Sequence, residues 1–282
     1  MPTVRQLLEE AVTKLRDAGV DTPILDAEVM LAHVLDRSRT DLLTHPELQP
    51  APEAIAQFQQ SIARRSLREP LSYITGEREF YGLAFEVTPA VLIPRQETEI
   101  LLEAALSVLQ KSESPMVADI GLGSGCIAVA IAVSLPNALV YGTESSPEAL
   151  EVAGRNAERL GVADRARFME GSLLSPLLGM RFDMIVSNPP YIPSGEFECL
   201  QPEVSKYEPR EALDGGSDGL DAHRRLAAES PAYLKPGGSI AVEVGVGQSR
   251  IVEALLQENG FGNVRFAEDY AGIERVVIGE RP

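Results

Sequence analysis

The sequence predicts an α/β protein in which a mostly parallel sheet with helices on both faces follows a small all-helical domain. From about residue 116, short runs of apolar and β-branched residues alternate with helical patterns, which is typical of a parallel sheet. The first 70 residues contain only helical patterns. The expected organisation is therefore a helical domain over residues 1–70, a linker over 71–96 and an α/β domain over 97–282.

The helical domain opens with a capping box, in which Thr3 and Gln6 can satisfy each other's backbone N–H groups. Pro23 and Pro52 each stand at the first turn of a further helix, where a helix does not need the missing N–H of proline. Pro70 ends the last of these helices. No residue of this domain indicates a chemical reaction.

Residues 71–96 are rich in β-prone side chains, interrupted by Gly76 and Gly82, and predict a short hairpin. A helix over about 97–111 follows. At the end of the chain, two expected strands are joined by a loop too short for a parallel crossover, so they form an antiparallel pair. The expected strands are 116–120, 138–143, 166–170, 182–187, 239–245, 264–267 and 275–278, and the helices between them are 126–134, 147–160, 219–233 and 248–259.

The composition, with 44% apolar and 24% charged residues, is that of a soluble globular protein. The only cysteines, Cys126 and Cys199, exclude a disulfide framework and a cysteine-rich zinc site, and they suit a reducing cytoplasm. No signal peptide or membrane span is indicated, so we expect a cytoplasmic protein without a membrane partner and without a bound metal. The net charge of -17 disfavours nucleic acid as a partner, because phosphate binding depends on Lys and Arg.

A glycine-rich loop follows the strand expected at 116–120 and opens the next helix. Its glycines, Gly121, Gly123 and Gly125, alternate with other residues, whereas dinucleotide-binding loops have G-x-G-x-x-G spacing. Asp119 stands two positions before the first glycine, where a negative charge suits the sulfonium of S-adenosylmethionine and would repel a pyrophosphate. We therefore predict an S-adenosylmethionine site that includes Asp119, Gly121, Leu122, Gly123, Ser124 and Gly125.

Two further residues are candidates for the same cofactor. Glu144 ends the second strand of the α/β domain, where an acidic residue can accept hydrogen bonds from both ribose hydroxyls. Leu173 follows the third strand, where the adenine would lie, and it offers an apolar face and a backbone N–H. Dehydrogenases share the acidic residue, so Glu144 alone does not distinguish the two classes of enzyme.

The tetrapeptide Asn188-Pro189-Pro190-Tyr191 follows the fourth strand and so lies beside the cofactor at the carboxyl edge of the sheet. Methylation of a planar NH2 group requires that its N–H bonds are held and that its lone pair points at the methyl carbon. The side-chain oxygen of Asn188 and the carbonyl of Pro189 can accept those two N–H groups. The ring of Tyr191 can cover the planar acceptor and exclude water. We predict that Asn188, Pro189 and Tyr191 are catalytic and that all four residues bind the substrate.

The chain also resembles the HemK/PrmC family, the protein-(glutamine-N5) methyltransferases of peptide chain release factors. Three segments outside the tetrapeptide carry this resemblance: the linker Pro70-Leu71-Ser72-Tyr73-Ile74-Thr75-Gly76-Glu77-Arg78-Glu79-Phe80, the segment Ile93-Pro94-Arg95-Gln96-Glu97-Thr98-Glu99, and the segment from Glu208-Pro209-Arg210 to Gly219. Three positions depart from the family pattern. Gln96 stands in place of Pro, Glu144 in place of the commoner Asp, and Ser172 in place of Asp.

The resemblance implies a class I methyltransferase fold, a Rossmann-like seven-stranded sheet whose last strand is antiparallel. It implies that Gly121 to Gly125, Glu144, Leu173 and Asn188 line the S-adenosylmethionine site, with S-adenosylhomocysteine as product. The acceptor would be the glutamine of the Gly-Gly-Gln loop of class 1 release factors. The helical domain would bind the release factor.

Three other functions remain open at this point. A nucleic-acid amino methyltransferase acting on adenine N6 or guanine N2 would use the same tetrapeptide, although it would favour a basic surface. A non-catalytic module could keep the cofactor fold as a scaffold. An NAD-dependent dehydrogenase is disfavoured by the spacing of the glycines.

Overall fold

The computed structural model describes residues 1–282 and divides the chain into two compact units. The helical unit comprises Met1–Glu77 together with Gln201–Tyr207, and the sheet unit comprises Arg78–Leu200 together with Glu208–Pro282. The helical unit therefore extends beyond residue 70, the boundary expected from the sequence. It also takes in a second, distant segment that no sequence pattern indicates.

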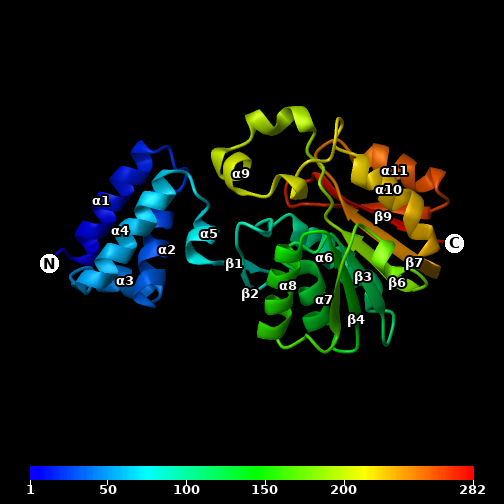
Figure 1. Cartoon of the computed structure of the whole chain (residues 1–282), viewed down its shortest axis with the longest axis horizontal. Helices are drawn as coiled ribbons and strands as arrows, with labels where there is room; N and C mark the ends of the chain where they lie inside the picture. Colours follow the sequence, from blue (N-terminus) through cyan, green and yellow to red (C-terminus); the bar gives the residue numbers. More distant parts are fainter. The chain divides into compact units, whose positions relative to one another are not determined.

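Apolar faces of the helices of the first unit enclose one core, which includes Leu15, Leu31 and Phe58. The capping box predicted at Thr3 is present, with the Thr3 side chain accepting from the Gln6 N–H and the Gln6 side chain accepting from the Thr3 N–H. The helices are α1 (Val4–Asp17), α2 (Pro23–Leu35), α3 (Arg39–Thr44), α4 (Pro52–Ser66) and α5 (Leu71–Thr75), and Figure 1 labels them.

The short helix α5 corrects the prediction for the start of the linker, where β-prone residues favoured a strand. Pro70 stands at its N-cap with φ near -55°, and Gly76 ends it in the left-handed conformation with φ of 77°. These two residues confine Leu71–Thr75 to a single helical stretch. The predicted hairpin lies just beyond, as strands β1 (Glu77–Phe80) and β2 (Leu83–Glu86).

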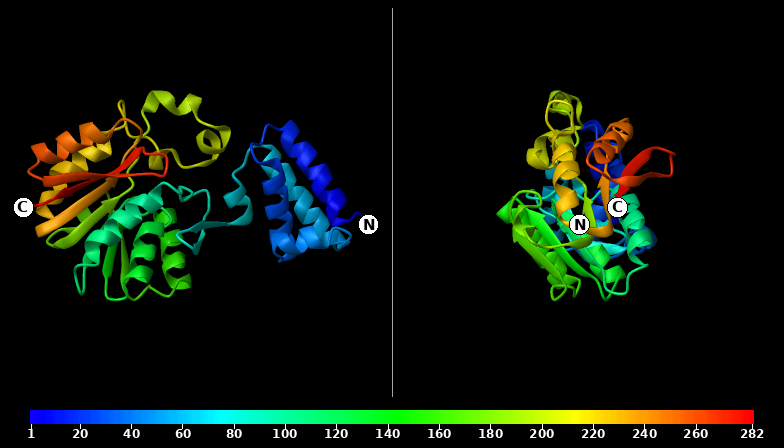
Figure 2. Two further views of the ribbon diagram at one scale, coloured as in Figure 1. Left: turned by 180° about the vertical axis from the view of Figure 1, so that it is seen from behind. Right: turned by 90° about the vertical axis from the view of Figure 1, so that its right-hand side faces the viewer.

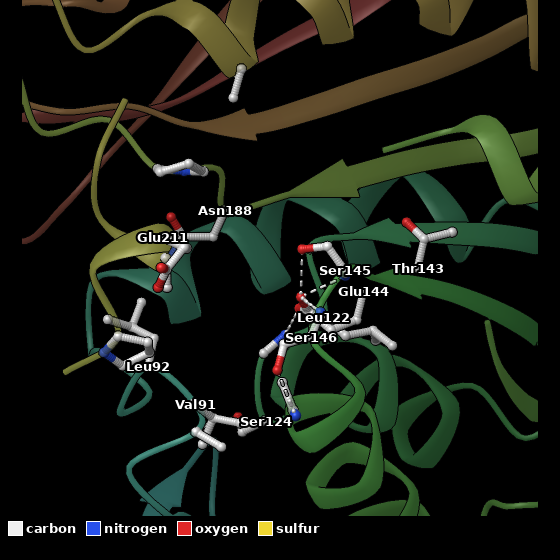
Figure 3. Close-up of a pocket in the computed structure, with 18 of the residues that line it drawn as sticks. Val91, Leu92, Leu122, Ser124, Thr143, Glu144, Ser145, Ser146, Asn188 and Glu211 are labelled. Atoms are coloured by element: carbon white, nitrogen blue, oxygen red, sulfur yellow. Dashed lines mark hydrogen bonds between the residues drawn. The ribbon is translucent and has the colours of Figure 1, made fainter. Parts of the chain in front are cut away.

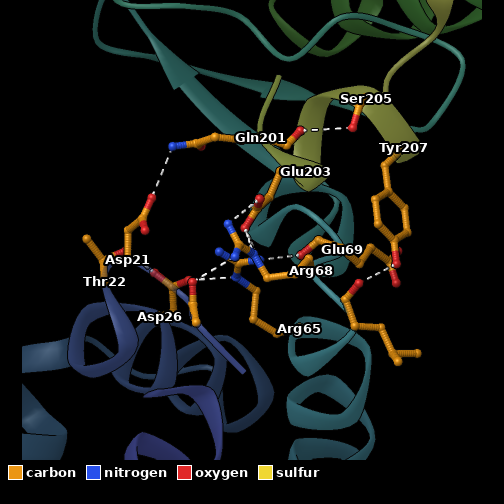
Figure 4. Close-up of polar contacts among 12 residues, drawn as sticks. Asp21, Thr22, Asp26, Arg65, Arg68, Glu69, Gln201, Glu203, Ser205 and Tyr207 are labelled. Carbon is orange, nitrogen blue, oxygen red and sulfur yellow. Dashed lines mark hydrogen bonds and ion pairs between the residues drawn. The ribbon is translucent and has the colours of Figure 1, made fainter. Parts of the chain in front are cut away.

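Helix α9 (Pro202–Tyr207) belongs to the helical unit although it lies far along the chain. Its Glu203 accepts hydrogen bonds from Arg65 Nη1 at 2.9 Å and from Arg68 Nε and Nη2 at 2.6 and 2.7 Å. Arg65 is only 7% exposed and also donates to the buried Asp26 at 2.7 Å. Figure 4 shows this cluster of alternating charges, which fixes α9 to α2 and α4.

The second unit contains a seven-stranded sheet in the order β5-β4-β3-β6-β7-β9-β8. Every neighbouring pair is parallel except the two that involve β9, which is antiparallel to both β7 and β8. The expected α/β class and the antiparallel terminal pair are thus confirmed. The strands are β3 (Met116–Ile120), β4 (Leu139–Glu144), β5 (Ala166–Glu170), β6 (Phe182–Ser187), β7 (Leu234–Glu243), β8 (Gly262–Glu268) and β9 (Glu274–Glu280).

Helices cover both faces of this sheet, as Figure 2 shows from two directions. Successive side chains of a strand point to opposite faces of the sheet, and each face has its own apolar core. Val117 and Met184 pack in one core, and Ala118 and Ile185 pack in the other. Continuous apolar runs in these strands follow from that double burial. One face carries α6 (Thr98–Leu109), α7 (Cys126–Ser134) and α8 (Pro147–Arg159), and the other carries α10 (Asp221–Glu229) and α11 (Ser249–Glu258).

Several element boundaries differ from the sequence prediction by one or two residues, and two differ by more. Strand β7 begins at Leu234 rather than near residue 239, because Leu234 already pairs with Phe182, and the strand then continues through a shift of register to Ser239. Helix α10 ends at Glu229, and the next turn, Ser230–Ala232, is a 3-10 helix with Pro231 inside it. None of the helices is long and apolar enough to cross a membrane.

The buried charges of the helical unit lead to a stability prediction. The Arg65→Ala variant should lower the free energy of unfolding by about 3 kcal/mol or more, because Asp26 would stay buried without its cation. Urea unfolding followed by circular dichroism measures the change. Arg37→Ala is the matched control, since it breaks the exposed pair Arg37–Asp41 in the same unit and should change stability little. Similar losses in both variants would contradict the prediction.

Candidate functional site

A cavity of about 720 Å³ opens at the carboxyl edge of the sheet, within the sheet unit. The ends of β3, β4, β5 and β6 all reach it, as the parallel arrangement requires. Figure 3 shows the glycine-rich loop and the end of β4 on one side and Asn188 with Glu211 on the other. The predicted residues that line it are Gly121, Leu122, Gly123, Ser124, Glu144, Leu173, Asn188 and Pro190.

The glycine-rich loop adopts a conformation that requires its glycines. Gly121, Gly123 and Gly125 all have positive φ, between 53° and 78°. A Cβ on Gly123 would meet nothing within 4 Å, so this position leaves open space that a cofactor can occupy. A Cβ on Gly125 would instead lie 3.0 Å from the Cβ of Ala153, because here α7 packs closely on α8. Gly123 and Gly125 therefore have different tasks, and only Gly123 of the two lines the cavity.

Glu144 connects the glycine-rich loop to the start of α8. Its Oε2 accepts from the Gly123 N–H at 2.9 Å, and its Oε1 accepts from the N–H groups of Ser145 and Ser146 at 2.7 and 3.1 Å. A carboxylate oxygen has two lone pairs, so Oε2 can accept one further hydrogen bond. Glu144 lines the cavity, and its predicted contact with the ribose hydroxyls of the cofactor stays a prediction.

Asp119 lies beneath the loop and is absent from the lining of the cavity. It is fully buried, and its Oδ2 accepts from the N–H of Ala128 in the first turn of α7 at 3.0 Å. Burial raises the pKa of Asp119 to about 8, opposed by the Ala128 N–H and reinforced by the charge of Glu144. The side chain therefore caps the helix that follows the loop, and its predicted contact with the cofactor stays a prediction.

The loop after β5 presents Leu173 to the cavity in a strained conformation, with φ of 48°. Gly171 precedes it with φ of 152°, and a Cβ there would lie 2.4 Å from Pro176. Residues with side chains are rarely found in such conformations, so the loop holds Leu173 at a fixed place on the wall. Ser172 lines the cavity next to it.

Asn188 lines the cavity at the end of β6, and its amide is anchored to α6. Its Nδ2 donates to Oγ1 of Thr98 at 3.0 Å. The amide has only one other polar atom, Oδ1, which is therefore the atom left for a ligand. No hydrogen bond of the chain ends at the carbonyl oxygen of Pro189, which also remains open to a donor. That these two oxygens accept the N–H groups of a substrate stays a prediction.

Neither Tyr191 nor Pro189 lines the cavity. The hydroxyl of Tyr191 donates to Oε1 of Glu243 at 3.4 Å, and burial raises the pKa of this phenol above its ordinary value. The backbone carbonyl of Tyr191 accepts from Gln248 Nε2 at 3.0 Å. The ring is thus held from both ends, and its predicted contact with the substrate stays a prediction.

Glu243 is a buried acid that the sequence interpretation missed. It is 1% exposed, and burial raises its pKa to about 7, opposed by hydrogen bonds from Thr98 and Tyr191. The signal was present in the sequence, because Glu243 is the one charged residue in the apolar run from Ile240 to Val244. An acid inside a strand buried on both faces is rarely found without a partner or a task.

Two segments singled out by the sequence meet at the same cavity. Glu208 is buried, accepts from the N–H of Ile93 at 3.2 Å and forms an ion pair with Arg95. Arg95 and Thr98 line the cavity from one segment, and Pro209 lines it from the other. The pairing explains why these distant stretches both carry distinctive residues, although their sequences gave no sign that they touch.

Known proteins resemble this chain along nearly its whole length. A family model described as the PrmC N-terminal domain matches residues 6–76, and one described as the methyltransferase small domain matches residues 96–199. A release factor glutamine methyltransferase of Geobacter sulfurreducens is 48% identical over 98% of this chain and 96% of its own length. The chain belongs to the PrmC family of release factor glutamine methyltransferases. The release factor glutamine methyltransferase of Moorella thermoacetica is 46% identical over 99% of both chains. That of Vibrio cholerae is 39% identical over 99% of this chain and 96% of its own length.

Solved structures support the fold of a class I methyltransferase. The hMettl16 catalytic domain in complex with a MAT2A 3′UTR hairpin aligns with a TM-score of 0.59 at 15% identity, over 88% of this chain and 90% of its own. The Thermus thermophilus 16S rRNA N2 G1207 methyltransferase, with AdoMet and guanosine, aligns with a TM-score of 0.55 at 21% identity, over 73% of this chain and 50% of its own. At these identities the likeness concerns the fold alone. The methyl donor of this PrmC family member is S-adenosylmethionine.

The raised pKa of Asp119 predicts how stability depends on pH. The folded carboxyl stays protonated up to about pH 8, whereas the unfolded one ionises near pH 3.8. Asp119 therefore stabilises the fold fully below about pH 4, and this part of the free energy of unfolding is lost as the pH rises through 8. The Asp119→Asn variant does not titrate, so its stability relative to the wild type should rise from pH 5 to pH 8, by up to about 1.4 kcal/mol per pH unit. Thermal unfolding at each pH measures this. Glu113→Gln, at an exposed turn, is the control, and a difference that does not vary with pH would refute the prediction.

The wall of the cofactor cavity yields a second prediction. A Cβ on Gly142 of β4 would lie 2.4 to 2.7 Å from three side-chain atoms of Leu122, so Gly142→Ala must drive Leu122 into the cavity. Overpacking of this kind costs about 1–3 kcal/mol, and we expect S-adenosylmethionine to bind about tenfold more weakly. Calorimetry measures the affinity. The double variant Gly142→Ala/Leu122→Ala should recover most of it, and a double variant as weak as the single one would speak against this cause.

Proposed function

We propose that this protein transfers the methyl group of S-adenosylmethionine to the side-chain amide nitrogen N5 of a glutamine in class 1 peptide chain release factors, and that this glutamine belongs to their Gly-Gly-Gln loop. The observation that carries the proposal is the amide of Asn188. Its nitrogen donates one N–H to Thr98, so its oxygen is the acceptor left for a ligand in the cavity that Glu144 and the glycine-rich loop share. An acceptor oxygen at this place suits an incoming NH2 group.

The names of the full-length relatives support the choice of substrate. Those relatives are release factor glutamine methyltransferases, and they match this chain over both the helical unit and the sheet unit. The acidic balance of the chain, -17, also suits a protein better than a polyphosphate. Both cysteines are free thiols, which suits a reaction in the reducing cytoplasm, where we place it.

The residues of the site would act by positioning. An amide nitrogen is a poor nucleophile, because its lone pair is delocalised over the carbonyl group. The Asn188 Oδ1 and the Pro189 carbonyl would accept its two N–H groups and so direct the lone pair along one line. These hydrogen bonds strengthen as the nitrogen becomes tetrahedral, which happens mainly in the transition state. Two prolines in succession hold the backbone that carries the second acceptor.

S-adenosylmethionine supplies a methyl group on a positively charged sulfur, which departs as neutral S-adenosylhomocysteine. The substrate nitrogen forms a bond to the methyl carbon and loses one proton to solvent. The product is a neutral N5-methyl amide, so charge and atoms balance. No strong base is required, because the attacked carbon is already activated. The Glu144 carboxylate and the apolar Leu173 would orient the nucleoside part of the donor.

The decisive experiment is methyl transfer from labelled S-adenosylmethionine to purified release factors. We expect label on a release factor with an intact Gly-Gly-Gln loop and none when its glutamine is changed to alanine. RNA and DNA fragments should remain unlabelled. Label on nucleic acid alone would establish the amino methyltransferase alternative, and failure to bind S-adenosylmethionine would favour a non-catalytic module.

The role of Asn188 gives a further prediction. The Asn188→Ala variant should lower kcat by about 100-fold or more, the scale found when one positioned hydrogen-bonding group of an active site is removed. Binding of S-adenosylmethionine should weaken much less, because the glycine-rich loop and Glu144 remain. Near-normal turnover of Asn188→Ala would refute the assignment.

The ring of Tyr191 gives a separate prediction. Tyr191→Ala should cost more activity than Tyr191→Phe, since the phenylalanine keeps the ring.

A further inference from the structure

The acid Glu243 lies directly behind the tetrapeptide and takes no part in the proposed reaction. It stands on β7, paired with Val276 of β9, and points to the face of the sheet that α6 covers. It is 1% exposed, and its Oε2 has no hydrogen-bond partner. A carboxyl in this position costs stability, so a fold that retains it calls for an explanation beyond packing.

The surroundings of Glu243 give it few ways to be satisfied. The charge of Glu97 opposes its ionisation, and that of Arg275 favours it. Arg275 is itself paired with Asp269 at 2.8 Å. On α10, the buried ring of His223 contacts the backbone carbonyl of Glu243 rather than its carboxyl. What remains are two hydroxyl donors, one from Thr98 on α6 and one from Tyr191.

The hydroxyl of Thr98 decides the direction of the hydrogen bonds. Thr98 is 2% exposed, and its hydroxyl has a single proton to donate. An ionised Glu243 can only accept, so that proton is directed to the carboxylate. The Thr98 oxygen then has only lone pairs to offer Asn188, and it receives Nδ2–H at 3.0 Å. Oδ1 of Asn188 must consequently face the other way.

The arrangement would be ambiguous without the acid. The Thr98 proton could then turn to Asn188, and the amide could rotate by half a turn to receive it on Oδ1. Asn188 would present its own NH2 group to the NH2 group of the substrate, and two donors cannot form a hydrogen bond. The two amide orientations have nearly the same shape, so packing alone cannot select between them.

We propose that Glu243 is a positioning residue that, through Thr98, fixes the amide of Asn188 with its oxygen toward the acceptor. The inference rests on the proposed function, because it explains how the predicted acceptor oxygen is oriented. The same carboxylate receives the hydroxyl of Tyr191, so one buried group holds both ends of the tetrapeptide. Glu243 touches neither substrate nor cofactor in this scheme.

Paired variants test the inference. Thr98→Val and Glu243→Met remove the hydroxyl and the acceptor with little change of shape, and each should lower kcat by about 10- to 100-fold, as misplacement of a reacting group does. Thr98→Ser and Glu243→Gln keep a hydroxyl and an acceptor oxygen, and each should stay within about threefold of the wild type. The affinity for S-adenosylmethionine, measured by calorimetry, should be unchanged in all four.

Two readouts separate positioning from a structural role. Glu243→Met removes a buried acid, so it should melt at the same or a higher temperature at pH 8 than the wild type while kcat falls. The double variant Thr98→Val/Glu243→Met should lose no more activity than Thr98→Val alone, because both act through one relay. Loss of stability together with activity, or losses that multiply, would overturn the proposal.

A measurement without release factor keeps this proposal distinct from the proposed function. In wild-type protein labelled with ¹⁵N, the Nδ2 hydrogens of Asn188 should exchange slowly with solvent, and exchange should be faster in Glu243→Met. Equal exchange in both would overturn the positioning role, whatever the substrate is. If the wild type methylates no release factor, the proposed function fails, and the exchange result still decides the role of Glu243.

Discussion

The site depends on one constraint, which is that β3, β4, β5 and β6 run parallel. Their carboxyl ends must then meet at one edge of the sheet, and each helix that returns the chain lies on one of its faces. The glycine-rich loop, Glu144, Leu173 and Asn188 are brought together for this reason alone, although the first and last are far apart in sequence. The long insertions that follow the strands refine the cavity, but the strand direction creates it.

Two buried acids distinguish this edge from an ordinary apolar core. Asp119 and Glu243 are each at most 1% exposed, and burial raises the pKa of both. The exposed ion pairs of the chain, such as Arg37 with Asp41, contribute little to stability because water screens them. Where an acid is kept in spite of its cost, the polar groups around it gain a fixed direction. Asp119 orients the N–H of Ala128 in the first turn of α7. Glu243 orients the hydroxyl groups of Thr98 and Tyr191.

Periodicity in the sequence was sufficient for the central elements. The strands expected at 116–120, 166–170 and 182–187 and the helix at 126–134 have the bounds found in the structure. Those at 116–120, 126–134 and 182–187 are largely apolar and buried, so local pattern and tertiary burial agree there, whereas the strand at 166–170 is only partly buried. The start of the linker was different, because Leu71–Thr75 is β-prone but is confined to a helix by Pro70 and Gly76.

Side-chain partnerships could not be derived in the same way. The lining of the cavity by Glu144, Leu173 and Asn188 follows from strand ends, which a sequence reveals. The tie between Glu208 and the segment around Ile93, or between Thr98 and Asn188, depends on which loops meet in space. Residues such as Glu243 stood out only as an anomaly of composition within a strand. Asp119 lies within β3, one residue before its end, and its carboxyl accepts from the N–H of Ala128 in α7, a contact that the sequence did not indicate.

The small helix α9 has a consequence for how this protein can be divided. The chain leaves the sheet unit after Leu200, contributes Gln201–Tyr207 to the helical unit, and returns at Glu208. A fragment cut after Glu77 would leave Glu203 behind and strip Arg65 and Arg68 of their shared anion. The helical unit is therefore not a portable module, and gene fusion or recombination at that point would separate charges that fold together. We expect the two units to be inherited as a pair.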